Sequence, residues 1–334
     1  MGVGLVRPRS SIAPAAARAG WRQARGPAGG RARRARGGPA GGRACRWGTA
    51  YAFIFPVLAL TVIFSVLPLV LVFQRSLYRG NIFGTNLSFA GLANYRAVFS
   101  TGGGHALIVT ATFTAGFVAV CMLIGFAIAL LLDVKLPGLK QVRAFFIIPM
   151  VVPPVATAFI WFTLFQPDTG LFNRVLSTAG LPQATLSTPS TALIAVIAFG
   201  AWQFFGEVVL LYLAALKALP QDLLEAASID GAGAWQRLRY IRWPLLRHQT
   251  ALIAIITTLN GLQTFTQIYV LTNGGPQGAT QTALYYVYQE AFGLGAGGSV
   301  GLADAMAVLL FLISLLITIG QLTVIGRTAK TVGA

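Results

Sequence analysis

Six stretches of apolar residues, each long enough to cross a bilayer as an α-helix of about 20 residues, dominate the sequence. A soluble core could bury one such stretch but not six. Only 10% of the residues are charged, against about 25% in soluble domains. A transmembrane β-barrel would instead show short alternating segments. We therefore predict an all-α, multi-pass membrane protein with six transmembrane helices, at about residues 50–73, 105–132, 144–166, 191–219, 250–272 and 303–326.

Positive charge is unevenly distributed between the segments that connect these spans. With the N-terminus inside, the inner segments hold 21 Lys and Arg residues and the outer segments hold 4. Without residues 1–49 the counts are still 10 and 4. Because cytoplasmic segments carry the excess of Lys and Arg, we expect both termini and residues 217–249 to be cytoplasmic.

Residues 1–49 form a basic tail rich in Arg, Ala and Gly, and the first acidic residue of the chain is Asp133. We expect this tail to be disordered, because its composition cannot bury a core. It is not typical of a secretory signal, since its charged region is too long. Three interpretations of the tail stay open. It could be attracted to anionic lipid, or it could be a transit peptide. The third and favoured interpretation is a solvated extension or a start codon assigned too far upstream. Residues 327–334 are expected to be a cytoplasmic C-terminus.

Residue types that supply catalytic or metal-binding chemistry are scarce. The two cysteines, Cys45 and Cys121, cannot build a disulfide framework, and the two histidines are expected at opposite membrane faces. The spans contain no nucleophile–base pair or metal-ligand cluster, and the chain has no G-x-x-x-x-G-K-[ST] phosphate loop. We therefore expect no enzymatic activity, no cofactor or metal, and no nucleic-acid partner.

The longest polar interval after the first span runs from Glu225 to Pro244. It follows Pro220, whose fixed φ suits the start of a helix, and acidic residues occupy the first turns. Gly231 can adopt the left-handed conformation that ends a helix. The pattern predicts a short helix, a glycine hinge, and a second short helix that begins near Ala234 and ends at Pro244.

Two interpretations of this helix pair are equally compatible with its composition. Its arginines and Trp235 suit an interfacial element that rests on lipid. The small side chains of Ala226 and Ala227 would instead let another protein surface approach closely.

The order of residues in this interval resembles the EAA loop of permeases that belong to ATP-binding-cassette importers. Trp243 stands where that pattern usually has Leu. The matching positions are Glu225, Ala226, Ala227, Asp230, Gly231, Ile241 and Pro244. Other segments resemble sugar-type permeases related to the maltose and glycerol-3-phosphate systems, over about residues 50–326. These segments are Gly91–Tyr95, Asp168–Leu171 with Asn173, Trp202 with Gly206, Leu219–Pro220, Phe265–Pro276 and Gly301–Ala307.

The resemblance implies a type I importer permease fold in a bacterial cell membrane. Residues 220–244 would form a coupling helix that docks on a separate ATPase subunit, so ATP hydrolysis would occur in a partner. The implied partners are a second homologous permease subunit, two ATPase subunits, an extracytoplasmic solute-binding protein and membrane lipid. The chain would form half of a pathway for a sugar or sugar-like solute.

Polar residues in the fourth and fifth spans are candidates for the solute path. They are Gln203, Glu207, Asn260, Gln263, Thr264 and Gln267. The last four recur at i, i+3, i+4 and i+7 and would form one polar stripe on a continuous helix. Hydrogen bonding between helices is an equal alternative. In the maltose systems only one of the two permeases contacts the sugar.

Glu207 is the one ionisable residue near the middle of a span, and a functional role is favoured because a structural acid there is costly. Related permeases usually carry an uncharged residue near this position, so the resemblance assigns Glu207 no role. An acid in the path would favour a neutral sugar over an anionic solute. The alternative function is an ion-gradient-driven secondary transporter or channel that uses Glu207 and Asp304.

Overall fold

The computed structural model describes residues 53–80, 87–134, 139–167, 169–181, 183, 186–293 and 298–330. The chain divides into two compact units, residues 1–58 and 59–334. The predicted basic tail and residues 331–334 lie outside the described residues. The first unit is described only over residues 53–58, which are helical. The following paragraphs concern the second unit.

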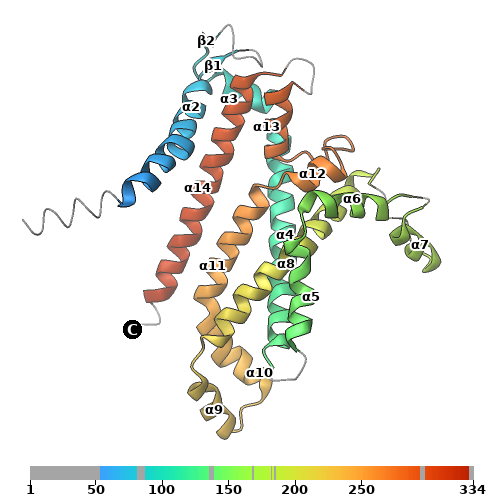
Figure 1. Ribbon diagram of the computed structural model, residues 1–334, viewed down its shortest axis with the longest axis vertical. Helices are drawn as coiled ribbons and strands as arrows, with labels where there is room; N and C mark the ends of the chain where they lie inside the picture. The colour runs from blue at the N-terminus through green and yellow to red at the C-terminus, as the bar shows by residue number, and fades with distance from the viewer. Residues whose placement is uncertain are drawn as a thin grey trace, which may run out of the picture. The chain divides into compact units, whose positions relative to one another are not determined.

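Helices make up most of the described chain (Figure 1). Two short strands, β1 (Tyr78–Arg79) and β2 (Ser88–Phe89), pair antiparallel. The first two helical elements are a π-helical turn, η1 (Val62–Val66), and α2 (Leu67–Arg75). The others are α3 (Ala93–Ser100), α4 (Gly103–Leu132), α5 (Leu139–Val151), α6 (Pro154–Leu164), α7 (Leu171–Thr178), α8 (Pro189–Lys217), α9 (Gln221–Ile229), α10 (Ala234–Arg237), η2 (Leu238–Arg242), α11 (Trp243–Leu262), α12 (Thr266–Leu271), α13 (Ala283–Phe292) and α14 (Val300–Lys330).

The described residues contain five helices that are long and apolar enough to cross a membrane, or six if the bent pair α5–α6 is one span. The five are Phe53–Arg75, Gly103–Leu132, Pro189–Lys217, Ala234–Leu271 and Val300–Thr323. The pair α5–α6 bends by 94°. Pro149, Pro153 and Pro154 account for this bend, because a proline inside a helix removes a backbone donor and its ring clashes with the preceding turn.

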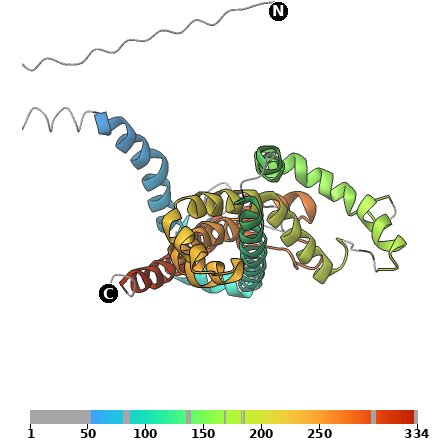
Figure 2. The same cartoon turned by 90° about the horizontal axis from the view of Figure 1, so that it is seen from below.

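Helices α4 and α8 form the centre of the bundle, and α11 packs against both (Figure 1). Their contact buries Phe113 and Phe117 of α4, and the ring of Phe117 packs edge-on against Phe204 of α8. At Gly125 of α4 an added Cβ would lie 2.5 Å from a methyl group of Val208, so the glycine allows the two helices to approach closely. In both views α7 lies at the periphery of the bundle (Figure 2).

Buried asparagines fix several short elements. One of them, Asn94, lies at the end of the bundle where α3 and α13 lie, here called the α13 end (Figure 1). Asn94 Nδ2 donates to the carbonyls of Ser76 (2.8 Å) and Tyr78 (2.9 Å). Gly301 leaves room for this contact, because an added Cβ would lie 2.1 Å from the Tyr78 carbonyl oxygen. Asn173 donates in the same way to two carbonyls that follow α6. These residues of the motif segments therefore have structural roles.

The helix that begins at Ala234 does not end at Pro244, so that prediction was wrong. Elements α10, η2 and α11 follow one another as a continuous helix. In the π-helical turn the N–H of Trp243 bonds to the carbonyl of Leu238, five residues back. The wider turn moves the carbonyl that the ring of Pro244 would otherwise strike, so the helix continues through the proline. Pro68 follows η1 in the same way.

Within the candidate span Ala234–Leu271 the helix is interrupted, so the predicted single polar stripe on a continuous helix was also wrong. Helix α11 ends at Leu262, and α12 starts after a break at Gln263–Phe265. Phe265 has φ −140° and ψ −57°, which is not helical. Thr282 Oγ1 donates to the Thr264 carbonyl (3.2 Å), a group that the break leaves without a helical partner. Non-helical backbone is tolerated at this depth because the protein itself satisfies it.

Candidate functional site: the projecting EAA segment and the polar groups of the bundle

Residues 220–244, here called the EAA segment, project from the end of the bundle opposite the α13 end (Figure 1). Helix α9 follows Pro220 and has Asp222 in its first turn, as predicted. Gly231 has φ +80°, which confirms the left-handed hinge. The N–H of Ala232 closes the helix end on the Ala227 carbonyl (2.9 Å).

The outward surface of the EAA segment combines an acid with large apolar side chains. Glu225 is exposed, and so are Ile229 (87%), Trp235 (72%) and Tyr240 (73%). Several large apolar side chains exposed on one short segment favour a surface for a protein or a membrane. A hollow of about 330 Å³ lies between the two arms of the segment. It is lined by Asp230, Gly231, Ala232, Gln236, Tyr240 and Ile241.

Two contacts attach the second arm of the segment to α4. Arg242 forms an ion pair with Asp133 at the end of α4 (3.4 Å). The ring of Trp243 packs edge-on against Phe126, with centroids 5.6 Å apart. Tryptophan at the position where the family pattern usually has Leu therefore has a specific partner. Sequence reasoning missed the ion pair, although opposite charges in the two predicted inner segments were a signal for it.

Gln203 lies against the bend between α5 and α6 and is 2% exposed. Its Nε2 donates to the carbonyls of Pro149 (2.5 Å) and Val152 (3.1 Å), and its Oε1 accepts from Thr157 (2.7 Å). These carbonyls lie at the helix break, where backbone groups lose their partners. The geometry of Gln203 is that of the interhelical alternative, in which the amide stabilises a bend rather than facing a solute.

Glu207 and Asn260 face each other between α8 and α11. Asn260 Nδ2 donates to Glu207 Oε2 over 3.5 Å, a long hydrogen bond. Both side chains are partly buried. Although Gln203 and Glu207 are four residues apart on α8, they contact different helices. The acid and the amide thus form one polar pair inside the bundle.

The other three candidates lie at or beyond the break in the fifth span. Gln263 is exposed, whereas Thr264 and Gln267 are buried. Thr264 Oγ1 has no hydrogen-bond partner among the described residues. Gln267 Nε2 lies beside Gly200 of α8. A Cβ added to Gly200 would lie 3.4 Å from this nitrogen. The break therefore distributes these polar groups over several directions instead of one helix face.

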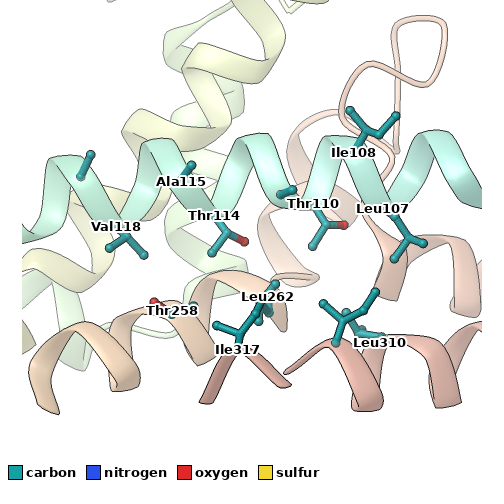
Figure 3. Close-up of a pocket in the computed structure, with 13 residues that line it drawn as sticks. Leu107, Ile108, Thr110, Thr114, Ala115, Val118, Thr258, Leu262, Leu310 and Ile317 are labelled. Atoms are coloured by element: carbon teal, nitrogen blue, oxygen red, sulfur yellow. The ribbon is translucent and has the colours of Figure 1, made fainter. Parts of the chain in front are cut away.

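An apolar pocket of about 640 Å³ lies between α4, α11 and α14 (Figure 3). Leu107 and Ile317 are among the side chains that line it, together with three threonines. The Thr110 hydroxyl bonds to the Ala106 carbonyl and the Thr258 hydroxyl bonds to the Ala254 carbonyl, each over 2.7 Å. These two hydroxyls already have partners, and of the three threonines Thr114 alone has a hydroxyl without one among the described residues, so the pocket has few polar groups to offer a hydroxyl-rich solute.

Within the described residues, no group of three or more His, Cys, Asp or Glu side chains could hold a metal ion. Three features together define a multi-pass membrane transport subunit. They are the long apolar helices, the broken spans with polar groups inside the bundle, and the projecting helical segment.

The chain belongs to the family of binding-protein-dependent transport system inner membrane components, whose model matches residues 121–329. It is therefore an importer permease component rather than an enzyme.

Two characterised relatives are similar over most of their length. The trehalose/maltose transport system permease protein MalF of Thermococcus litoralis is 36% identical over 276 residues, which cover 82% of this chain and 92% of the relative. The sn-glycerol-3-phosphate transport system permease protein UgpA of Agrobacterium fabrum is 33% identical over 273 residues, which cover 81% and 92%.

A solved bacterial ABC transporter involved in the import of the acidic polysaccharide alginate contains a chain with the same fold. The TM-score is 0.74 at 21% identity, and the match covers 86% of this chain and 98% of that one. The type I importer permease fold predicted from the sequence is thereby confirmed.

Proposed function

We propose that the chain is one of two permease subunits of an ATP-driven importer and forms half of the pathway for a neutral sugar or sugar-like solute. ATP would be hydrolysed by two separate ATPase subunits, and an extracytoplasmic binding protein would deliver the solute. The projecting EAA segment is the single observation that carries this proposal. The positive charge of the inner segments supports an orientation with both termini and the EAA segment in the cytoplasm.

The EAA segment is connected to the bundle in a way that suits energy transfer. Its first arm follows α8 through Leu219 and Pro220, and its second arm continues into α11. The ion pair between Arg242 and Asp133 adds α4 to the connection. A displacement imposed on the segment by an ATPase subunit would therefore reach the three central helices together.

Helix α11 links this contact to the polar groups of the bundle. Its 20 residues span about 30 Å, and Asn260 lies near its far end. The helix breaks directly beyond, at Gln263–Phe265. In our proposal the coupling residues Glu225, Ala226, Ala227, Asp230, Gly231, Ile241 and Pro244 receive the movement, and the break is where α11 can move relative to α12.

The solute class is supported by the polar groups and by the relatives. Asn260, Gln263, Thr264 and Gln267 offer amides and a hydroxyl, which match the donors and acceptors of a sugar. Glu207 would repel an anionic solute. The named relatives transport trehalose and maltose or glycerol-3-phosphate. Of these classes the acid at Glu207 favours the neutral sugars.

Uptake in membrane vesicles tests this function against an ion-gradient-driven transporter. The importer takes up solute only with ATP and the binding protein, and dissipating the proton and sodium gradients leaves uptake unchanged. Uptake that needs a gradient but neither ATP nor a binding protein would contradict the proposal and favour the alternative.

A further inference from the structure

Four aromatic rings in contact with one another lie at the α13 end of the bundle, directly beyond the break in the fifth span. We call Phe265, Tyr269, Tyr288 and Phe292 the aromatic row. Phe265 stacks on Tyr269 with centroids 5.5 Å apart, and both rings contact Tyr288 (5.1 and 5.4 Å). Tyr288 contacts Phe292 in turn (5.0 Å). None of the candidate path residues predicted from the sequence belongs to this row.

The row is partly open to its surroundings. Tyr269 is 45% exposed and Phe292 is 67% exposed, although both belong to a cluster of four rings. The two tyrosines of the row add hydroxyls at the edges of this apolar surface. A surface that is apolar on its faces and polar at its edges suits a partner with the same combination.

The loop after α12 holds this row in a fixed geometry. Tyr285, whose ring is 6.3 Å from those of Phe265 and Tyr288, donates its hydroxyl proton to Asn273 Oδ1 (2.7 Å). Gly274 lies flat against the same ring, since an added Cβ would come within 2.6 Å of it. A surface fixed before binding loses less conformational entropy when a ligand arrives.

We propose that the aromatic row is a carbohydrate-binding surface at the outer mouth of the pathway, where pyranose rings stack before they reach Asn260 and Gln263. A pyranose has an apolar C–H face that packs on an aromatic ring and hydroxyls that bond at its rim. Phe265 is two residues from Gln263, so the row is continuous with the proposed path. The two exposed rings, Tyr269 and Phe292, both contact Tyr288, so the surface offers more than one ring and an oligosaccharide fits better than a monosaccharide. This inference rests on the proposed sugar import.

Saturation-transfer NMR with maltotetraose as the probe tests the row, using the assembled importer in lipid nanodiscs without ATP. Wild-type protein is expected to transfer saturation to the sugar ring protons. Phe292→Leu and Tyr288→Leu should each weaken binding about two- to tenfold, the range expected for loss of one aromatic contact. Phe99→Leu is the matched control, because Phe99 of α3 is 60% exposed and lies outside the row.

Three results would overturn the inference: no transfer in the wild type, equal transfer in the row variants and the control, or transfer to the isolated chain but not to the assembled importer. The last result would make the row a subunit interface. Binding of maltotetraose to the row needs no ATP. Uptake driven by an ion gradient would therefore contradict the proposed ATP-driven import without changing the NMR result. Conversely, loss of the row's binding would leave the ATP dependence of uptake intact.

Discussion

Replacing Gln203 by Leu should destabilise the bend between α5 and α6 more than any neighbouring single change. The variant loses the bonds to the Pro149 and Val152 carbonyls and to the Thr157 hydroxyl. Hydrogen bonds between transmembrane helices are worth about 0.6 to 1.7 kcal/mol each. Three bonds therefore predict a loss of about 2 to 5 kcal/mol in the free energy of unfolding.

Thr157→Val is the matched comparison, because it removes only one of the three Gln203 bonds, together with the contacts of the Thr157 hydroxyl to the Pro153 and Pro154 carbonyls, and keeps the volume of the side chain. We expect it to cost about 1 kcal/mol. Unfolding in mixed detergent micelles can be followed by tryptophan fluorescence, since Trp161 and Trp202 pack beside the bend with centroids 5.4 Å apart. A loss in Gln203→Leu no larger than that in Thr157→Val would refute the structural role of Gln203.

Three further changes probe other parts of the structure. Gly206→Ala places a Cβ 2.4 Å from the Phe146 carbonyl oxygen and should lower the free energy of unfolding by about 1–3 kcal/mol. Gly200→Ala, whose Cβ would have its nearest neighbours at 3.4 Å, should lower it less in the same unfolding assay. Glu207→Gln should change the apparent affinity for the solute, and wild-type uptake across a range of pH would remove this acid from the path. Burial raises the pKa of Glu290, because a buried carboxylate loses its hydration. Protonation of Glu290 therefore stabilises the folded state at low pH, and this stabilisation is lost as pH rises through the raised pKa. Glu290→Gln should therefore raise Tm more at pH 7 than at pH 4, and an equal rise at both would contradict this cause.

The spans and the bend could be predicted because each is a local property of the sequence. Hydropathy over about 20 residues identifies a membrane helix without knowledge of its neighbours. The three prolines between Pro149 and Pro154 leave too few backbone donors for a straight helix. Gly231 was also predictable, since its left-handed φ of +80° is one that glycine adopts at little cost.

The errors concern features that depend on distant partners or on the hydrogen-bond register. Pro244 normally ends a helix, and only the π-helical turn before it allows the helix to continue. The break at Gln263–Phe265 contains no Pro or Gly, and the Thr264 carbonyl is satisfied by Thr282, 18 residues away. Gln203 finds its partners about 50 residues earlier in the chain. Spacing within one helix cannot reveal such contacts.

The central claim is that energy from separate ATPase subunits enters through the EAA segment. Its most direct test is the amount of solute transported per ATP hydrolysed by the reconstituted importer. Glu225→Lys reverses an exposed charge on α9 and should lower this ratio severalfold while the chain stays inserted. Gly233→Ala, in the same segment, has φ −67° and only one neighbouring atom, at 3.7 Å, and should keep the wild-type ratio. An unchanged ratio in Glu225→Lys would contradict the account.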